Sequence, residues 1–229
     1  MQPHALWVIA GTALAYVLVA LPALQIAIPP SYASPLYPSA GIALAAVLVY
    51  GRVAMVGAAL GGFLANVSLI ALRGNVDLIG ALVPAATAIG SALQAGAGAW
   101  LVQRYARHPR ALDEPRDVAV LFGLGGALAC VVAPSVATLV LTATGIVPRA
   151  GALETWLTWW VGDTFGAMIC TPIALTLIGR PRADWAARRA IVGLTLALVT
   201  LVMALGIAQV VRWDAERLRN AFVRDASLA

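Results

Sequence analysis

The sequence has no lysine and few charged residues, which make up 11% of its 229 positions. Soluble domains carry about 25% charged residues, so this deficit, together with 62% hydrophobic residues and a mean hydropathy of +0.90, excludes an ordinary soluble domain. Two cysteines, Cys130 and Cys170, both lie within apolar runs and do not indicate a disulfide framework or a metal pair.

Sequence patterns for catalysis are also missing. There is no nucleotide-binding loop, no cluster of metal ligands and no recognisable pair of nucleophile and base. The two histidines, His4 and His108, stand at or outside the edges of the apolar runs, where a lone histidine is usually solvated. We therefore expect no catalytic residue, no metal site and no cofactor in this segment, which is not expected to be an enzyme.

The charges that are present are distributed as in a membrane protein. All 15 basic residues are arginines, and the formal net charge is +5. The arginines stand in short segments between apolar runs, which is typical of membrane topology and not of a nucleic-acid-binding face. We predict an all-α integral membrane protein, a polytopic bundle of about seven transmembrane helices, with membrane lipid and no nucleic acid as partners.

The expected spans cover about residues 5–24, 39–50, 53–72, 78–105, 118–144, 153–179 and 190–211. Pro134 is expected to kink or break the fifth run, and two crossings there would raise the count to eight. The loops on one side contain most of the arginines: Arg52, Arg104, Arg107, Arg110, Arg116, Arg180, Arg182, Arg188 and Arg189. The positive-inside rule therefore predicts a cytoplasmic N-terminus and an Ala229 end outside the cytoplasm.

One acidic residue is expected deep in the bilayer. Asp163 lies about ten residues into its span, hence about 15 Å deep in a layer about 30 Å thick. Helical spacing places Trp156, Trp159, Trp160 and Cys170 on roughly the same face. A carboxylate at this depth is costly and is by default a functional-site hypothesis. The alternative is that Asp163 only hydrogen-bonds a neighbouring helix for structure.

No arginine is expected at the depth of Asp163, so its expected partners are Asn66, Gln94, threonine hydroxyls, indole N–H groups or water. We predict a signal-sensing site of Asp163, Trp159, Trp160, Asn66, Gln94 and Trp156. The tryptophans have two interpretations, an interfacial belt, which suits Trp156, or a pocket wall and tight packing, which suit the deeper two. Small residues and prolines are expected at helix contacts: Gly162, Gly166, Gly61, Gly41, Pro38 and Pro172.

The last residues, 212–229, form a separate segment. Trp213, Leu218 and Phe222 make a narrow apolar stripe surrounded by charges. A helix that continues out of a span and stops without a cap suggests that the chain is the N-terminal part of a longer protein. A naturally short protein that ends in an interfacial helix is the alternative.

Three groups of residues, taken in order, resemble a known family. They are Pro38–Leu44 followed by Gly51, Arg52, Gly61 and Asn66; Gly90–Gln94 through Arg104; and Trp159–Asp163 with Gly166 and Pro172. This order is similar to the first class of membrane-associated sensor domain (MASE) over about residues 5–211. Ser91 stands where asparagine is usual and Gln94 where an acidic residue is usual, which argues against a mechanism that needs two buried carboxylates.

The resemblance implies a sensory input module in the inner membrane of a bacterium, at residues 1–211. Such domains precede histidine kinases, as in two-component systems, or cyclic-di-GMP enzymes of the GGDEF and EAL types. The implied partners are an unidentified small-molecule signal, a partner membrane protein, and a second copy joined through downstream domains. Residues 212–218 are similar to the entry helix of an extracytoplasmic CHASE domain, so 212–229 is expected to begin such a region.

Two other classes of function stay open. A small-solute or proton-coupled transporter would use Asp163 as its coupling group. A membrane-embedded enzyme is disfavoured because no second titratable group is expected near Asp163.

Overall fold

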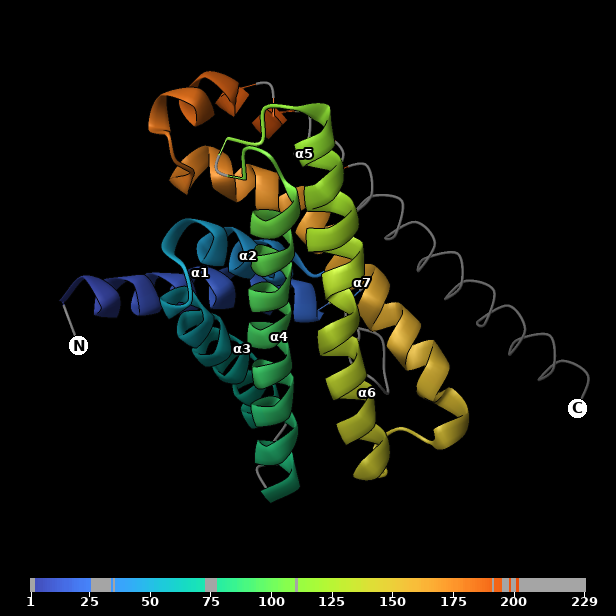
Figure 1. Cartoon of the computed structure of the whole chain (residues 1–229). Helices are drawn as coiled ribbons and strands as arrows, with labels where there is room; N and C mark the ends of the chain where they lie inside the picture. Colours follow the sequence, from blue (N-terminus) through green and yellow to red (C-terminus); the bar gives the residue numbers. More distant parts are fainter. Residues whose placement is uncertain are drawn as a thin grey trace, which may run out of the picture.

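The computed structural model describes residues 3–25, 34, 36–72, 78–109, 111–190, 192–194, 198 and 201. Every regular element within these residues is a helix, so the predicted all-α class is confirmed (Figure 1). Most of the expected span 190–211, and all of the segment 212–229, lie outside the described residues.

The helices follow the expected spans closely. In order they are α1 (Pro3–Gln25), α2 (Pro38–Tyr50), α3 (Val53–Leu72), α4 (Leu78–Tyr105), α5 (Pro115–Val120), the π-helix η1 (Leu121–Leu128), the 3-10 helix η2 (Ala129–Val131), α6 (Val132–Ala143), the 3-10 helix η3 (Arg149–Gly151) and α7 (Ala152–Ile178). Residues 182–190 are also helical.

Five helices in the described residues are long and apolar enough to cross a membrane: His4–Gln25, Val53–Ala71, Leu82–Tyr105, Pro115–Ala143 and Arg149–Ile178. Large apolar side chains cover the outside of the bundle; Leu18 and Leu139, for example, are 62% and 68% exposed. Such surfaces are rare on soluble monomers and suit contact with lipid. The protein is therefore a multi-pass membrane protein, although the predicted count of about seven spans is not confirmed.

Helix α2 differs from the other apolar helices because it is only 13 residues long. Its start lies against the middle of α7, where the amide of Tyr37 donates a hydrogen bond to the carbonyl of Gly162 at 3.0 Å. From there α2 lies along α7, with Gly41 packed against Gly166 and Thr171. Helix α2 therefore begins about 15 Å down α7, near mid-depth, and ends at Gly51 by the arginine-rich end of the bundle.

Glycines permit these close approaches. A Cβ atom on Gly166 would overlap the carbonyl of Tyr37, and one on Gly41 would overlap the carbonyl of Gly166. Gly61 has the same role between α3 and α1, where an added Cβ would lie 2.7 Å from the Cβ of Tyr16. Small residues at helix contacts let membrane helices gain van der Waals contact where lipid offers no hydrophobic driving force.

The fifth apolar run is one continuous helical stretch, Pro115–Ala143, with Pro134 inside the regular helix α6. The irregular turns, η1 and η2, come before Pro134, so the break expected at this proline is displaced toward the N-terminus. Proline has no N–H and its ring crowds the carbonyl four residues earlier, which is Cys130 here. The helix widens over residues 121–128 and tightens over 129–131 before α-helical geometry resumes.

The arginine-rich end of the bundle is held by a buried acid. Asp117 is fully buried and accepts hydrogen bonds from the backbone amides of Arg107 and His108, at 2.8 and 2.9 Å. Arg188, from the helical segment 182–190, donates to the carbonyl of Ala111 at 2.6 Å. The loop after α4 and the segment after α7 therefore meet at one end, as Figure 1 shows.

His108 is exposed, as expected for a histidine outside the apolar runs, but it has acidic neighbours that were not expected. Its Nδ1 lies 3.3 Å from Asp113 and within 3.7 Å of Glu114 and Asp117. This grouping could not be expected from residue spacing, because only the fold of the loop brings these side chains together. His108, Glu114 and Asp117 offer potential metal-ligand atoms within 4.8 Å of one another. Both carboxylate oxygens of Asp117 already accept backbone amides, which accounts for its burial without a metal.

Candidate functional site

Asp163 lies inside the bundle, with 5% of its surface exposed. Its Oδ2 accepts a hydrogen bond from Nε2 of Gln94 on α4 at 2.9 Å, and Gln94 is equally buried. Gln94 was one of the partners expected for this carboxylate. No ion pair to Asp163 is present within the described residues, so its hydrogen bond is to a neutral amide.

The other end of the Gln94 amide reaches a third helix. Its Oε1 accepts a hydrogen bond from the backbone N–H of Ala133 at 3.1 Å. Ala133 is the second residue of α6, directly after the 3-10 turn. Because the amide of Gln94 donates at one end and accepts at the other, it joins Asp163 on α7 to the irregular segment before α6.

The same irregular segment has a second support from α7. Nε1 of Trp160 donates to the carbonyl of Ala127, within η1, at 2.8 Å. Non-helical backbone at membrane depth is tolerated where neighbouring protein groups satisfy it. Gln94 and Trp160 satisfy one N–H and one C=O, respectively, on either side of η2, so residues 121–133 are held by side chains of α4 and α7.

A small cavity lies beside the carboxylate. Its volume is about 20 Å³, and it is lined by Leu24, Tyr37, Asn66, Thr87, Ser91, Trp159 and Asp163. A water molecule needs about 10–15 Å³ measured in this way. The cavity therefore accommodates one particle of the size of water, between oxygen-bearing side chains and the apolar Leu24 and Trp159.

The structure divides the predicted sensing residues into two groups. Asp163, Trp159 and Asn66 line the cavity, and Gln94 bonds to the carboxylate beside it. Trp156 and Trp160 contact the fifth run instead.

Their rings are stacked at 6.0 Å, and Nε1 of Trp156 donates to the hydroxyl of Ser135 at 3.0 Å. The residues that were expected on one face of α7 therefore have two different neighbours, the cavity and α6. Cys170 lies on a third side, against Gly41 of α2.

The predicted packing residues occupy helix contacts. Gly162 and Gly166 meet the start of α2 at Tyr37, and Pro38 is the first residue of that helix. Pro172 lies inside α7. Thr171, next to it, donates from its hydroxyl to the carbonyl of Gly41 at 3.2 Å. The pair Gly162 and Gly166 on α7 therefore packs against a loop and a half-length helix, and not against a helix that spans the whole membrane.

Sequence reasoning missed two tyrosines at the site. Tyr16 is 1% exposed in the middle of α1, and its ring packs edge-on against Tyr37 at 6.1 Å. Tyr37 lines the cavity. A tyrosine at the centre of an apolar span is a usable signal, since this residue favours the membrane interface. Tyr37, in contrast, stands in a proline-rich loop that gave no indication of its depth.

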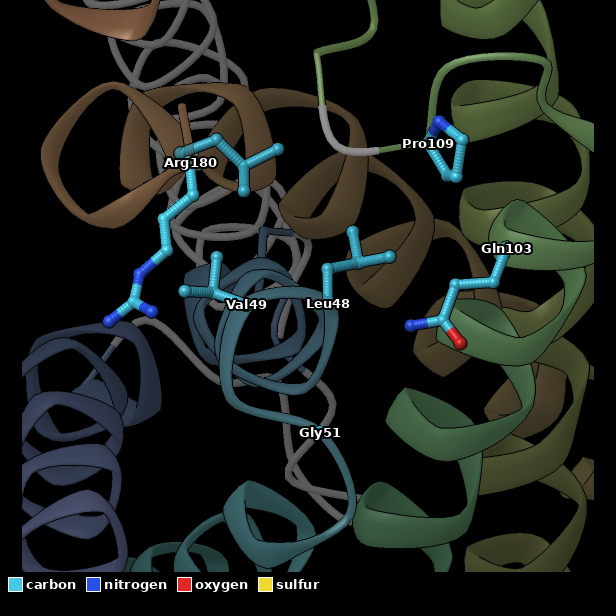
Figure 2. Close-up of a pocket in the computed structure, with 7 residues that line it drawn as sticks. Leu48, Val49, Gly51, Gln103, Pro109 and Arg180 are labelled. Atoms are coloured by element: carbon cyan, nitrogen blue, oxygen red, sulfur yellow. The ribbon is translucent and has the colours of Figure 1, made fainter. Parts of the chain in front are cut away.

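A larger cavity, of about 470 Å³, lies at the arginine-rich end, lined by Leu48, Val49, Gly51, Gln103, Pro109, Leu175 and Arg180 (Figure 2). Figure 2 shows the side chains of Arg180 and Gln103 on opposite sides of the end of α2. Small-molecule sites usually have polar groups that converge on the ligand. Because these two are separated by the end of α2, the cavity is a weaker candidate than the one at Asp163.

The fold and the site together define a multi-pass helical membrane protein with a buried polar network that joins three helices. The MASE1 family model matches residues 6–213, so the chain belongs to the MASE1 family of membrane sensor domains. These domains are sensory and non-catalytic and occur in signalling proteins. No curated protein and no solved structure matches the chain.

Proposed function

We propose that the chain is the input module of a bacterial signalling protein in the inner membrane, and that Asp163 is the residue through which the signal acts. One observation carries this proposal. The amide of Gln94 bonds at once to Asp163 on α7 and to the backbone N–H of Ala133 on α6. A signal that displaces or neutralises the carboxylate changes the hydrogen bonding of an irregular helix segment on another element.

The irregular segment supplies the second arrangement that such a switch needs. π-helical turns are often found at functional sites, and we propose that this one relaxes to α-helix with a shift of register. A signal changes this equilibrium only by its differential affinity for the two arrangements. Gln94 and Trp160 support the irregular arrangement, so a signal that weakens either contact favours the regular one.

The route from Asp163 to an output domain follows from the order of the helices along the chain. Helix α7 contains Asp163 and leads directly into the segment 182–190, which Arg188 joins to the loop after α4. We propose that a change in packing of α7 passes along this segment to domains downstream of it. A histidine kinase or a cyclic-di-GMP enzyme, preceded by a CHASE-like region from residue 212, is the output that the resemblance favours, and dimers would form through those domains.

The test fuses the chain, through one added transmembrane span that returns it to the cytoplasm, to a diguanylate cyclase output domain and measures cyclic-di-GMP in cells. Asp163→Asn keeps the size of the side chain and removes its charge, and we expect it to change the output several-fold at an equal amount of membrane-inserted protein. Glu154→Gln, on the exposed first turn of the same helix, is the matched control. Equal output from both variants and the parent would reject Asp163 as the sensing residue.

The transporter alternative has a separate test. Uptake of a solute into proteoliposomes that depends on Asp163 would support it. Membership in a family of sensor domains favours the sensory role.

A further inference from the structure

The carboxylate of Asp163 is only half satisfied. Its Oδ2 accepts from Gln94, whereas Oδ1 has no hydrogen-bond partner among the described residues. The side chain is 5% exposed and lines the small cavity. A carboxylate that faces a small enclosed cavity instead of bulk water is stabilised by hydrogen-bonding or ionic partners, so the cavity is the place where a further group would bind.

The bundle provides no cation for this carboxylate. No ion pair to Asp163 is present in the part of the chain that the structure describes, and no basic residue lines the cavity. The start of α2 is near, since Tyr37 lines the same cavity. The positive end of a helix dipole is equivalent to about half a charge, so it offsets only part of the negative charge.

The remaining lining offers oxygen ligands. Asn66 donates its Nδ2 to the carbonyl of Gly62 at 2.8 Å, which leaves its side-chain oxygen available. Thr87 donates its hydroxyl to the carbonyl of Pro84 at 3.1 Å, which leaves the lone pairs of Oγ1. The hydroxyl of Ser91 lies one turn further along α4. Carboxylate, amide and hydroxyl oxygens are the ligands that hard cations prefer.

Size and charge narrow the choice of cation. The volume of about 20 Å³ admits one particle of the size of water. A single carboxylate carries one negative charge, and the helix dipole offsets part of it, so the site does not balance a second positive charge. We propose that this cavity binds one sodium ion, with Asp163 as its charged ligand and Asn66, Thr87 and Ser91 as neutral ones. The inference deepens the proposed function, because sodium would then be a signal or a co-ligand at the sensing site.

The test measures thermal unfolding of the purified full chain in lipid nanodiscs, followed by tryptophan fluorescence, at fixed pH. Sodium chloride is compared with potassium chloride and choline chloride at equal ionic strength. We expect a saturable rise of the midpoint with sodium, roughly 3–6 °C at about ten times Kd, and a much smaller rise with the larger potassium ion. Asp163→Asn should abolish the sodium effect, and Glu154→Gln should retain it.

Ser91→Ala provides a second variant, which keeps the charge and removes one neutral ligand. We expect it to raise the sodium concentration at half-effect several-fold, so it tests the proposal even if Asp163→Asn does not fold. Equal stabilisation by sodium and choline, or unchanged sodium dependence in both variants, would overturn the sodium site. Sodium binding without any effect of Asp163→Asn on cyclic-di-GMP would instead reject the proposed sensory role and leave the site standing.

Discussion

Trp160 on α7 donates its indole N–H to the carbonyl of Ala127, in the π-helical turn of the fifth run, at 2.8 Å. The bond joins residues 33 positions apart and supports backbone that has left the regular helical pattern. Together with the bond from Ala133 to Gln94, it identifies residues 121–133 as the part of the bundle whose geometry depends most on its neighbours.

Trp160→Phe should loosen this segment. The variant keeps an aromatic ring and removes the N–H donor, which leaves one part-buried carbonyl without this partner at a cost of about 1 kcal/mol. We expect amide exchange in residues 121–131 to become roughly fivefold faster by mass spectrometry. Trp156→Phe, which loses an exposed bond to Ser135, should change exchange there much less. Equal protection in both variants would show that Trp160 is only a packing residue.

Gln94→Leu should destabilise the whole bundle. It leaves both the Ala133 N–H and the Asp163 carboxylate without this partner, and each such loss costs about 1–3 kcal/mol. The unfolding midpoint in detergent should fall by roughly 4 °C or more. Gln103→Leu, on the exposed face of the same helix, is the control. If the two leucine variants unfold at the same temperature, the network contributes little to stability.

Gly166→Ala should disturb the contact between α2 and α7. The new methyl group would overlap the carbonyl of Tyr37, a backbone atom that cannot move without shifting the start of α2. Overpacking of this kind costs roughly 1–3 kcal/mol. Gly11→Ala meets no atom within 4 Å and should be neutral or slightly stabilising because alanine favours helix. Thermal unfolding compares the two directly, and equal midpoints would contradict the contact described for Tyr37.

Labelling of introduced cysteines should report the orientation. In a background without Cys130 and Cys170, a cysteine at the exposed Asp113 marks the arginine-rich end and one at the exposed Ile146 marks the other end. A membrane-impermeant thiol reagent added to intact spheroplasts should label position 146 and not position 113, as the positive-inside rule requires. The reverse pattern would place the N-terminus outside.

Much of the fold could be predicted because apolar run length and arginine placement are local properties of the sequence. The bounds of α2, α3 and α4 agree with the expected spans to within a residue or two. The position of the break in the fifth run could not be predicted. Pro134 indicates that one backbone hydrogen bond of the helix is missing. The position at which the helix departs from α-helical geometry depends on Gln94 and Trp160, which lie on other elements.

Part of the site could also be predicted from local properties of the sequence. Asp163 and Gln94 are conspicuous because they are polar within apolar runs, and the structure brings them together. Trp156 and Trp160 share the face predicted from helical spacing but contact another helix. Periodicity gives the direction of a side chain from its own helix axis. It does not tell which neighbour stands there, and here α6 occupies that position.

The half-length of α2 has a consequence for how the domain is assembled. Its 13 residues extend about 20 Å, too short to cross a bilayer that needs about 20 helical residues. The amide of Tyr37 at its start donates to α7, which leaves the ribosome about a hundred residues later. The centre of the domain is therefore completed late in synthesis. Substitutions at the contact between α2 and α7 should therefore lower the yield of inserted protein more readily than they change the signalling output of the folded domain.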